Sequence, residues 1–152
     1  MIRFKTDRLI VRDISKEDID PLLKIYWKKE NMKFISDGTY GWSKVQLIEK
    51  YNKCNKNYDL GVGIFTICLK NTTGIIGEVG LFDSFGDLQK LESGYILDNT
   101  YWGQGFGKEL CNGLIKYSFN FLKIEKFISR MYAENIASVR LSEQCGMKRL
   151  KA

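Results

Sequence analysis

The chain has 152 residues, of which 44% are hydrophobic and 13% aromatic, a composition typical of a globular domain, so we expect residues 1–152 to form a single domain. It contains no histidine, which excludes Ser-His-Asp and Cys-His catalysis and leaves acid–base work to carboxylates, Tyr, Ser, Cys, Lys or water. The net charge is +6, but acidic residues are interspersed with the basic ones, which favours an attraction for anionic ligands over a nucleic-acid-binding face.

Membrane and metal functions are not expected. No apolar run approaches the roughly 18–20 residues of a membrane span, and residues 1–7 do not form a signal peptide. The four cysteines lack metal-ligand spacing, so we expect buried, reduced thiols and no metal site. These features predict a cytoplasmic protein.

The first third of the chain predicts a strand followed by two helices. Residues 8–12 are expected to form the strand, and Ser15 is expected to cap the first helix. Pro21 lies late for a first-turn proline, which predicts a later helix start or a bend. A loop is expected over residues 31–41, and Ser43 is expected to cap the second helix.

The middle of the chain predicts an antiparallel meander. Strands are expected over residues 63–69, 75–82 and 91–98, joined by short turns. An amphipathic helix is expected up to residue 122 and a strand over residues 126–133. Because a helix connects them, the strands on either side of it are expected to run parallel.

The end of the chain predicts one more helix. Asn135 is expected to cap it, and Gly146 is expected to terminate it in a left-handed conformation. Residues 147–152 are expected to begin a last strand.

A glycine-rich segment lies between the third meander strand and the next helix. Residues 101–109 read Tyr-Trp-Gly-Gln-Gly-Phe-Gly-Lys-Glu. Alternate glycines weaken strands and helices but let backbone N–H groups approach a ligand, and a helix start favours anions. The spacing fits neither a P-loop nor a dinucleotide-binding fingerprint. The segment therefore predicts a site for a phosphate-bearing ligand, with a purely structural turn as the alternative.

Several stretches together resemble the GNAT superfamily of acyl-CoA N-acyltransferases, and in particular the branch typified by the ribosomal-protein acetyltransferases RimJ and RimL. They are residues 6–12, 92–95, 101–109, 135–138 and 141–147. The resemblance implies an α/β (α+β) fold with a mixed, mostly antiparallel central sheet flanked by helices. It also implies a C-terminal end shorter than the family's, and we expect a partner such as a second copy to cover the exposed sheet edge.

The resemblance also implies which residues hold the acetyl-CoA co-substrate. In the family, backbone N–H groups of the glycine loop cradle the coenzyme pyrophosphate, and a strand N–H group stabilises the oxyanion where two central strands separate. That strand N–H group is expected at Ile96 or Leu97. The implied coenzyme-binding residues are Ile96, Leu97, Trp102, Gly103, Gln104, Gly105, Phe106, Gly107, Lys108 and Asn135.

Candidate acid–base groups follow from the reaction that the resemblance implies, acetyl transfer to a primary amine. A base or a water chain must remove the ammonium proton. The candidates are Glu92 and Glu78, each with a surface-facing strand carboxylate as its alternative, and Tyr95 is a further polar candidate. Ser142 stands where many members of the superfamily have a tyrosine acid. A serine matching Ser138 is implied instead, with support of the helix N-terminus as its alternative.

The leading hypothesis is an acetyl-CoA-dependent N-acetyltransferase acting on a protein N-terminus or a small-molecule amine. The alternative is a catalytically weak or inactive module that binds acyl-CoA or a partner, which the missing tyrosine favours. Nucleic-acid binding rests on net charge alone. Acceptor choice is expected to lie in the first two helices and in the loop that carries Phe34, Asp37, Tyr40 and Trp42.

Overall fold

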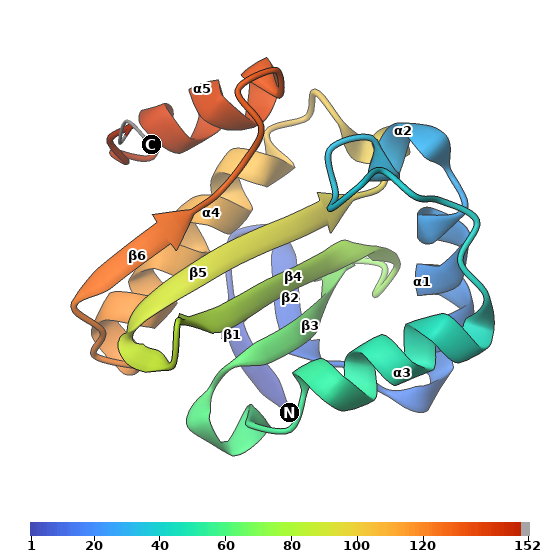
Figure 1. The fold of residues 1–152 in the computed structure, drawn as a ribbon, viewed down its shortest axis with the longest axis horizontal. Helices are drawn as coiled ribbons and strands as arrows, with labels where there is room; N and C mark the ends of the chain where they lie inside the picture. The colour runs from blue at the N-terminus through green and yellow to red at the C-terminus, as the bar shows by residue number, and fades with distance from the viewer. Residues whose placement is uncertain (150–152) are drawn as a thin grey trace.

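Six strands form one sheet whose spatial order follows the chain (Figure 1). The computed structural model describes residues 1–149. β1 to β5 pair antiparallel in succession, and β6 pairs with β5 in parallel. The meander β3–β4–β5 and the parallel pair confirm the prediction, whereas the strand β1 was not predicted. The strands are β1 (Ile2–Lys5), β2 (Leu9–Asp13), β3 (Gly63–Leu69), β4 (Ile75–Ser84), β5 (Asp87–Leu97) and β6 (Lys126–Ser129).

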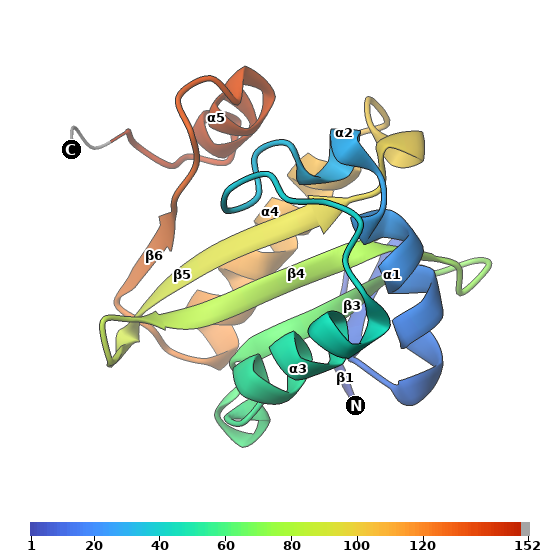
Figure 2. The same cartoon turned by 45° about the vertical axis from the view of Figure 1, so that its right-hand side comes forward.

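Helices cover both faces of this sheet (Figure 2). The first three helices pack on one face, α4 packs on the other, and α5 lies against α4. The helices are α1 (Ile19–Tyr26), α2 (Lys29–Met32), α3 (Lys44–Cys54), α4 (Phe106–Lys116) and α5 (Ile136–Gln144). Four shorter turns are η1 (Lys16–Asp18), η2 (Tyr58–Leu60), η3 (Asn99–Tyr101) and the π-turn η4 (Tyr117–Phe121).

Burial on both faces explains why the central strands have little polar alternation. In β3 the side chain of Ile64 belongs to the core under α1–α3, whereas Phe65 and Ile67 belong to the core under α4. All three are at most 1% exposed. Fully burying a side chain of this kind contributes about 2 kcal/mol, so this strand anchors both layers.

Local capping signals place two helices as predicted. Ser43 accepts a hydrogen bond from the N–H of Gln46 at the start of α3, and Asn135 accepts one from the N–H of Ser138 at the start of α5. Gly146 follows α5 with a φ of 89°. These caps satisfy backbone groups that have no partner within their helix.

Other boundaries differ from the prediction. The later helix start predicted from Pro21 is confirmed, because η1 precedes α1 and Pro21 is the third residue of α1. In this first turn an N–H group has no partner within the helix, so its absence in proline costs little. The helix expected to reach residue 122 changes at Tyr117 into η4, and β6 ends at Ser129. α2 occupies part of the expected 31–41 loop. Residues 147–149 form no strand, and residues 150–152 lie outside the described part of the chain.

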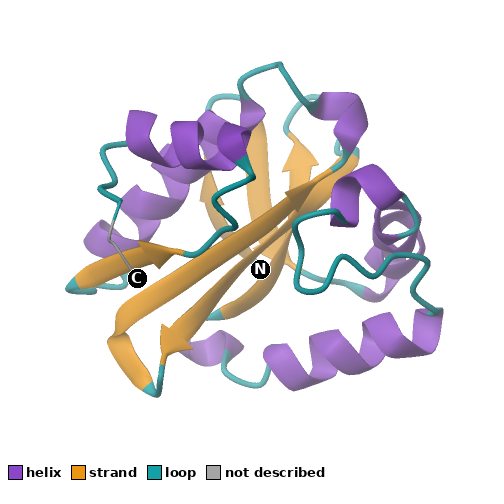
Figure 3. Ribbon diagram, turned by 45° about the horizontal axis from the view of Figure 1, so that its top comes forward, coloured by secondary structure: helices purple, strands orange, loops and turns teal. Residues whose placement is uncertain are grey.

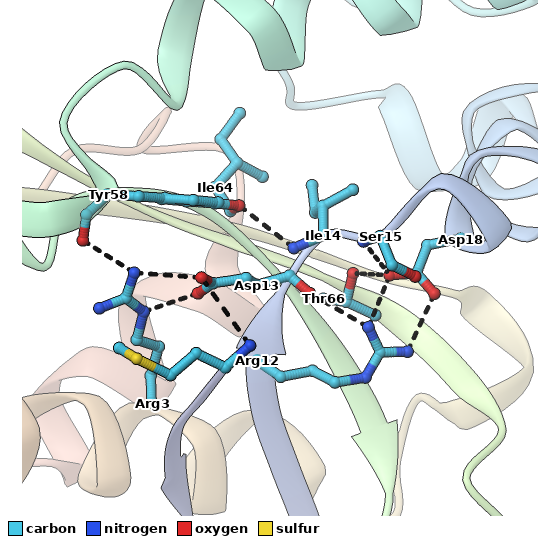
Figure 4. A network of polar contacts seen from close by, with 10 residues as sticks. Arg3, Arg12, Asp13, Ile14, Ser15, Asp18, Tyr58, Ile64 and Thr66 are labelled. Carbon is cyan, nitrogen blue, oxygen red and sulfur yellow. Dashed lines mark hydrogen bonds and ion pairs between the residues drawn. The ribbon is translucent and has the colours of Figure 1, made fainter.

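Asp18 attaches the start of α1 to the sheet (Figure 4). Its carboxylate accepts two N–H groups of Arg12 at 2.7 and 2.9 Å, the Thr66 hydroxyl at 2.9 Å and the Ser15 N–H at 2.8 Å. Burial by itself raises the pKa of Asp18, but the bonds from Arg12, Ser15 and Thr66 more than offset it and hold the pKa below its ordinary value. Two strands and one helix therefore meet at one ionised carboxylate.

We expect Asp18→Asn to lower the free energy of unfolding by about 3 kcal/mol, because Arg12 then faces a neutral partner in a largely buried setting. Urea unfolding at pH 7 measures this loss. Asp20→Asn is the matched control, because Asp20 pairs with Lys44 with 71% of its side chain exposed. An exposed pair of this kind contributes less than about 1 kcal/mol. Equal, small losses in both variants would contradict the role given to Asp18.

Candidate functional site

The parallel strands β5 and β6 separate partway along the sheet (Figure 3). Their pairing runs from Lys90 opposite Lys126 to Ser93 opposite Ser129, and β5 then continues to Leu97 without β6. We call the space between residues 94–97 of β5 and the segment that follows β6 the strand gap. Among the described residues, backbone groups on this side of β5 therefore have no strand partner beyond Ser93.

The register decides which N–H groups face the strand gap. The N–H of Asp98 donates to the Ile76 carbonyl of β4 at 2.8 Å. Because successive residues of a strand alternate in direction, Ile96 faces β4, whereas Tyr95 and Leu97 face the strand gap. The Leu97 carbonyl agrees with this, since it accepts the Trp102 indole N–H at 2.7 Å. Of the two residues expected from the sequence to supply the oxyanion-stabilising N–H, Leu97 directs its N–H into the strand gap. The N–H of Tyr95 points in the same direction.

The three alternate glycines have two different tasks. Gly103 and Gly105 adopt φ values of 76° and 82°, a left-handed region that costs other residues roughly 1–2 kcal/mol. Gly107 lies in the first turn of α4, where an added Cβ would come within 2.6 Å of the Leu141 side chain. The first helical bond is donated by the Glu109 N–H to the Gly105 carbonyl. The N–H groups at positions 106–108 precede that bond, which suits an anion at this end.

The first strand region supports the glycine loop through contacts that sequence reasoning missed. Arg8 donates through Nε to Glu109 at 2.7 Å and through a terminal nitrogen to the Gln104 carbonyl at 3.0 Å. Its guanidinium lies 4.1 Å from the centre of the Phe106 ring. Glu109 also accepts the Thr6 hydroxyl at 2.5 Å and the Arg8 backbone N–H at 2.7 Å. The loop is therefore held in place and has a cation beside it.

The remaining loop residues of the predicted coenzyme set make short-range contacts. The Gln104 side chain donates to the Thr100 carbonyl at 3.2 Å, and the Lys108 carbonyl lies 3.9 Å from the Cys145 sulfur. The Trp102 indole is half exposed at the end of the strand gap. These contacts shape the loop and leave its backbone N–H groups as the candidate ligand donors.

Glu78 is buried on β4, on the face that α1–α3 cover. One carboxylate oxygen accepts the Tyr26 hydroxyl at 2.7 Å and the other accepts the Tyr51 hydroxyl at 2.5 Å. The Lys50 ammonium lies 3.5 Å from the same carboxylate and also donates to Tyr26. Burial and the charge of Glu78 raise the pKa of both tyrosines, which therefore stay protonated as donors. The surface-facing alternative for Glu78 is wrong.

Glu92 lies where β5 and β6 are still paired, opposite Ile128. Its carboxylate forms an ion pair with Arg130 at 2.5 Å, and 22% of the side chain is exposed. The bond from Arg130 lowers the pKa of Glu92 below its ordinary value. Glu78 lies opposite Ile96, which is four positions farther along β5 than Glu92, a span of about 13 Å along a strand. Glu92 and Glu78 are therefore not brought together into one pair.

Tyr95 and Ser138 meet on the other side of the strand gap. The Tyr95 side chain lies on the α4 face, and its hydroxyl would be 3.7 Å from a Cβ at position 107. Burial raises the pKa of Tyr95, and the neighbouring Ser138 side chain lowers it to a smaller extent. Asn135, the cap of α5, accepts the Ser138 N–H at 3.4 Å. A hydroxyl pair from β5 and α5 therefore borders the gap near the glycine loop.

α2 and the residues on either side of it contact both sides of this region. Buried Asn31 donates to the Asp98 carboxylate at 3.0 Å and accepts the Asn99 N–H at 2.8 Å. Lys28 pairs with the same carboxylate at 2.8 Å. Farther along, the Tyr132 hydroxyl donates to the Ser36 carbonyl at 2.6 Å. The expected acceptor loop thus contacts the end of β5 and the segment after β6.

Two searches of the described residues concern other kinds of site. Among residues 1–149, no group of three His, Cys, Asp or Glu side chains could hold a metal ion. Within the same range, no helix has the length and apolar character needed to cross a membrane. All four cysteines are free thiols.

Comparisons with known proteins agree with this architecture. Residues 8–148 match the family model described as an acetyltransferase (GNAT) domain. The chain is 24% identical over 144 residues to the uncharacterized N-acetyltransferase YnaD of Bacillus subtilis, with 95% of this chain and 81% of that protein covered.

Two solved structures of related fold contain coenzyme A. A spermidine N-acetyltransferase from Vibrio cholerae, in complex with CoA and spermine, is 25% identical with a TM-score of 0.76, over 91% of this chain and 79% of that one. RimL, the ribosomal L7/L12 alpha-N-protein acetyltransferase, in complex with coenzyme A, is 16% identical with a TM-score of 0.81, over 95% and 82%. The second likeness concerns the fold alone.

The Glu109 contacts predict a pH-dependent contribution to stability. Burial by itself raises the pKa of Glu109, but Thr6 and Arg8 hold it below its ordinary value. A lowered folded pKa stabilises the protein above the ordinary glutamate value of about 4.3, and this stabilisation is lost as pH falls through the folded pKa.

We therefore expect Glu109→Gln to lower the free energy of unfolding by about 2 kcal/mol at pH 7 and by much less at pH 3. Urea unfolding at both pH values measures the difference. Glu125→Gln, at an exposed position, is the control and is expected to change little at either pH. A Glu109→Gln deficit that persists undiminished at pH 3 would argue against an ionised anchor.

Proposed function

Because the chain belongs to the GNAT acetyltransferase family, we propose that it transfers the acetyl group of acetyl-CoA to a primary amine by direct attack in a ternary complex. The observation that carries this proposal is the strand gap, whose inward N–H groups at Tyr95 and Leu97 lead to the glycine loop at the start of α4. One continuous backbone surface can thus accommodate a thioester, an extended arm and a pyrophosphate.

The residues of the loop fit the coenzyme. Left-handed Gly103 and Gly105 turn the chain so that the first N–H groups of α4 point outward, and Arg8 adds a positive charge beside them. Phosphate oxygens are suited to such a helix start. The candidate coenzyme set comprises Leu97, residues 102–108 and Asn135, with Ile96 contributing its side chain to the core rather than an N–H to the gap.

Acetyl-CoA supplies the activated acetyl thioester, and the chain supplies orientation and charge stabilisation. Negative charge develops on the thioester carbonyl oxygen as the amine attacks, and we propose that the N–H groups of Tyr95 and Leu97 stabilise it. The incoming ammonium must first lose a proton. Glu92 is our candidate base, acting through water, because it is partly exposed at the closed end of the strand gap.

We assign Glu78 a different part in the same reaction. Both of its carboxylate oxygens already accept tyrosine hydroxyls, so it is less free than Glu92 to accept a proton. Its bonds instead fix α1 and α3 over β4. We therefore propose that Glu78, a candidate base from the sequence, is a positioning residue.

The departing thiolate needs a proton, and we propose that Ser138 and Tyr95 supply it together. Both hydroxyls border the strand gap, and burial keeps Tyr95 protonated over the neutral range. Ser138 also lies at the capped start of α5, where its side chain can be fixed. This pair would supply the proton that a tyrosine supplies in superfamily members that have tyrosine at the position of Ser142.

The acceptor is proposed to be a primary amine, either a small molecule or a protein N-terminus. The related solved structures support both kinds, since one is a spermidine N-acetyltransferase and the other acetylates a ribosomal protein. Placement in the RimJ/RimL-like branch is likewise a proposal. It rests on the sequence motifs and the RimL fold likeness.

Further properties belong to the same proposal. We propose that residues 1–152 belong to one domain and that the protein is cytoplasmic, because its free thiols suit a reducing compartment. Among residues 1–149, β6 has one strand neighbour, and we propose that a second copy covers its other edge. Sedimentation as a monomer would exclude that dimer.

The second candidate function is a weak or inactive acyl-CoA-binding module, favoured by serine in place of tyrosine at position 142.

Calorimetric titration with acetyl-CoA, combined with thiol release over an amine panel, tests the function. We expect saturable binding and release with at least one amine class. Gly105→Val should weaken binding about tenfold, since its φ of 82° strains the loop that holds the phosphates. Gly86→Val is the control, because Gly86 has a φ of 85° in a hairpin remote from the loop. Binding without release would favour the inactive module, and no binding would refute the proposal.

We expect Ser138→Ala and Tyr95→Phe each to lower kcat by about 100-fold while acetyl-CoA affinity stays within threefold, because proton donation acts after binding. Ser142→Ala should leave kcat unchanged. Steady-state kinetics and calorimetry on the same preparations measure both quantities. A larger loss at Ser142 than at Ser138 would overturn the assignment of the proton donor.

A further inference from the structure

One glycine has no structural reason to be a glycine. Of the fourteen glycines in the chain, eight adopt positive φ values and five have a neighbouring atom within 3.4 Å of the position where a Cβ would stand. Gly94 alone combines an ordinary φ with no atom within 4 Å of that position. Its backbone would accept any residue, and open space lies where the side chain would be.

Gly94 lies in the interior of β5, the longest strand, and is nevertheless exposed. Ile96, two residues along, packs under α1–α3, so the open space lies on that face of the sheet. The cross-strand partner Gly80 is covered by the ring of Phe82, whose atoms come within 2.5 Å of a Cβ built there. The open space is therefore about one side chain wide, between Glu92 and Ile96.

The chain loses stability by keeping this glycine. Glycine within a strand weakens it through backbone entropy and missing packing, whereas a β-branched residue favours it. Nothing among the described residues offsets that loss at position 94. The neighbouring residue, Tyr95, directs its N–H into the strand gap, so the open space adjoins the proposed position of the thioester.

We propose that the open space over Gly94 is part of the acceptor site and determines its specificity. The acceptor is then a slender primary amine, unbranched at the carbon that bears nitrogen. This inference rests on the proposed acetyl transfer. The amine-bearing carbon lies over Gly94, its nitrogen faces the carbonyl held by Tyr95 and Leu97, and Glu92 takes up the ammonium proton through water. A side chain at position 94 would occupy the same space.

The test is a size series at one position, Gly94→Ala and Gly94→Val. Four quantities are measured: the melting temperature, the Kd of acetyl-CoA, kcat/KM for an unbranched amine and its α-methyl analogue, and the preference between acetyl-CoA and butyryl-CoA as donors. We expect Gly94→Val to raise Tm by a few degrees, to leave the Kd within threefold, and to lower kcat/KM about 100-fold. Gly94→Ala should increase the preference for the unbranched amine about tenfold.

Lys90→Val is the matched control, because it places a valine at an exposed position of the same strand. It should raise Tm without changing kcat/KM. Unchanged kcat/KM in Gly94→Val, with an active wild type, would overturn this inference and leave the proposed function standing. A marked fall in Tm would give Gly94 a structural role, and an altered preference between acetyl and butyryl donors would assign the space to the acyl group. Either result overturns the inference.

If the wild type binds acetyl-CoA but acetylates no amine in the panel, the proposed function and this inference both fail. If the α-methyl analogue is the better acceptor of the wild type, the unbranched acceptor class is wrong, which overturns this inference and leaves the proposed function standing.

Discussion

The separation of β5 from β6 after four paired residues is the constraint on which the site depends. A parallel pair satisfies backbone groups on both strands, so its early end leaves N–H groups of β5 without a strand partner on that side within the described part of the chain. The connection to α4 begins just beyond, and its glycines place a helix start at the end of the same strand. A single departure from regular pairing thus links a backbone donor surface to an anion-binding helix end.

Long-range polar contacts keep the two sides of this gap in place. Arg8 and Glu109 join the first strands to the glycine loop. Asn31 of α2 and Lys28 just before it contact Asp98 at the end of β5. Each contact links segments more than sixty residues apart in the chain. Because hydrogen bonds to charged groups are among the stronger ones, these contacts can hold a loop whose own backbone is strained.

The site contains groups that a structure selected for stability alone would not retain. Gly94 leaves open space beside the longest strand, and Glu78 is a buried carboxylate that contacts two tyrosine hydroxyls and a lysine. A buried charge is costly unless it is paired and hydrogen-bonded. Both features lie on the sheet face beneath α1–α3, where the acceptor is proposed to bind.

The sequence by itself determined the elements whose signals are local. Ser43 and Asn135 marked helix starts, the apolar periodicity marked the meander and α4, and the alternating glycines marked the loop, because capping, periodicity and positive φ are properties of a few neighbouring residues. The family could be recognised from the same motifs. Boundaries were less certain, as η4 and the short β6 demonstrate, since packing rather than periodicity ends those elements.

Only the tertiary structure decided which side chains meet and which backbone groups are left available. The choice of Leu97 over Ile96 depends on strand register, and the burial of Glu78 depends on the packing of α1 and α3. The Arg8–Glu109 contact joins two residues that lie about a hundred positions apart in the chain. The open space over Gly94 depends on Phe82 covering Gly80 and on nothing covering its partner. Such features arise from contacts between distant segments, and no local pattern in the sequence encodes them.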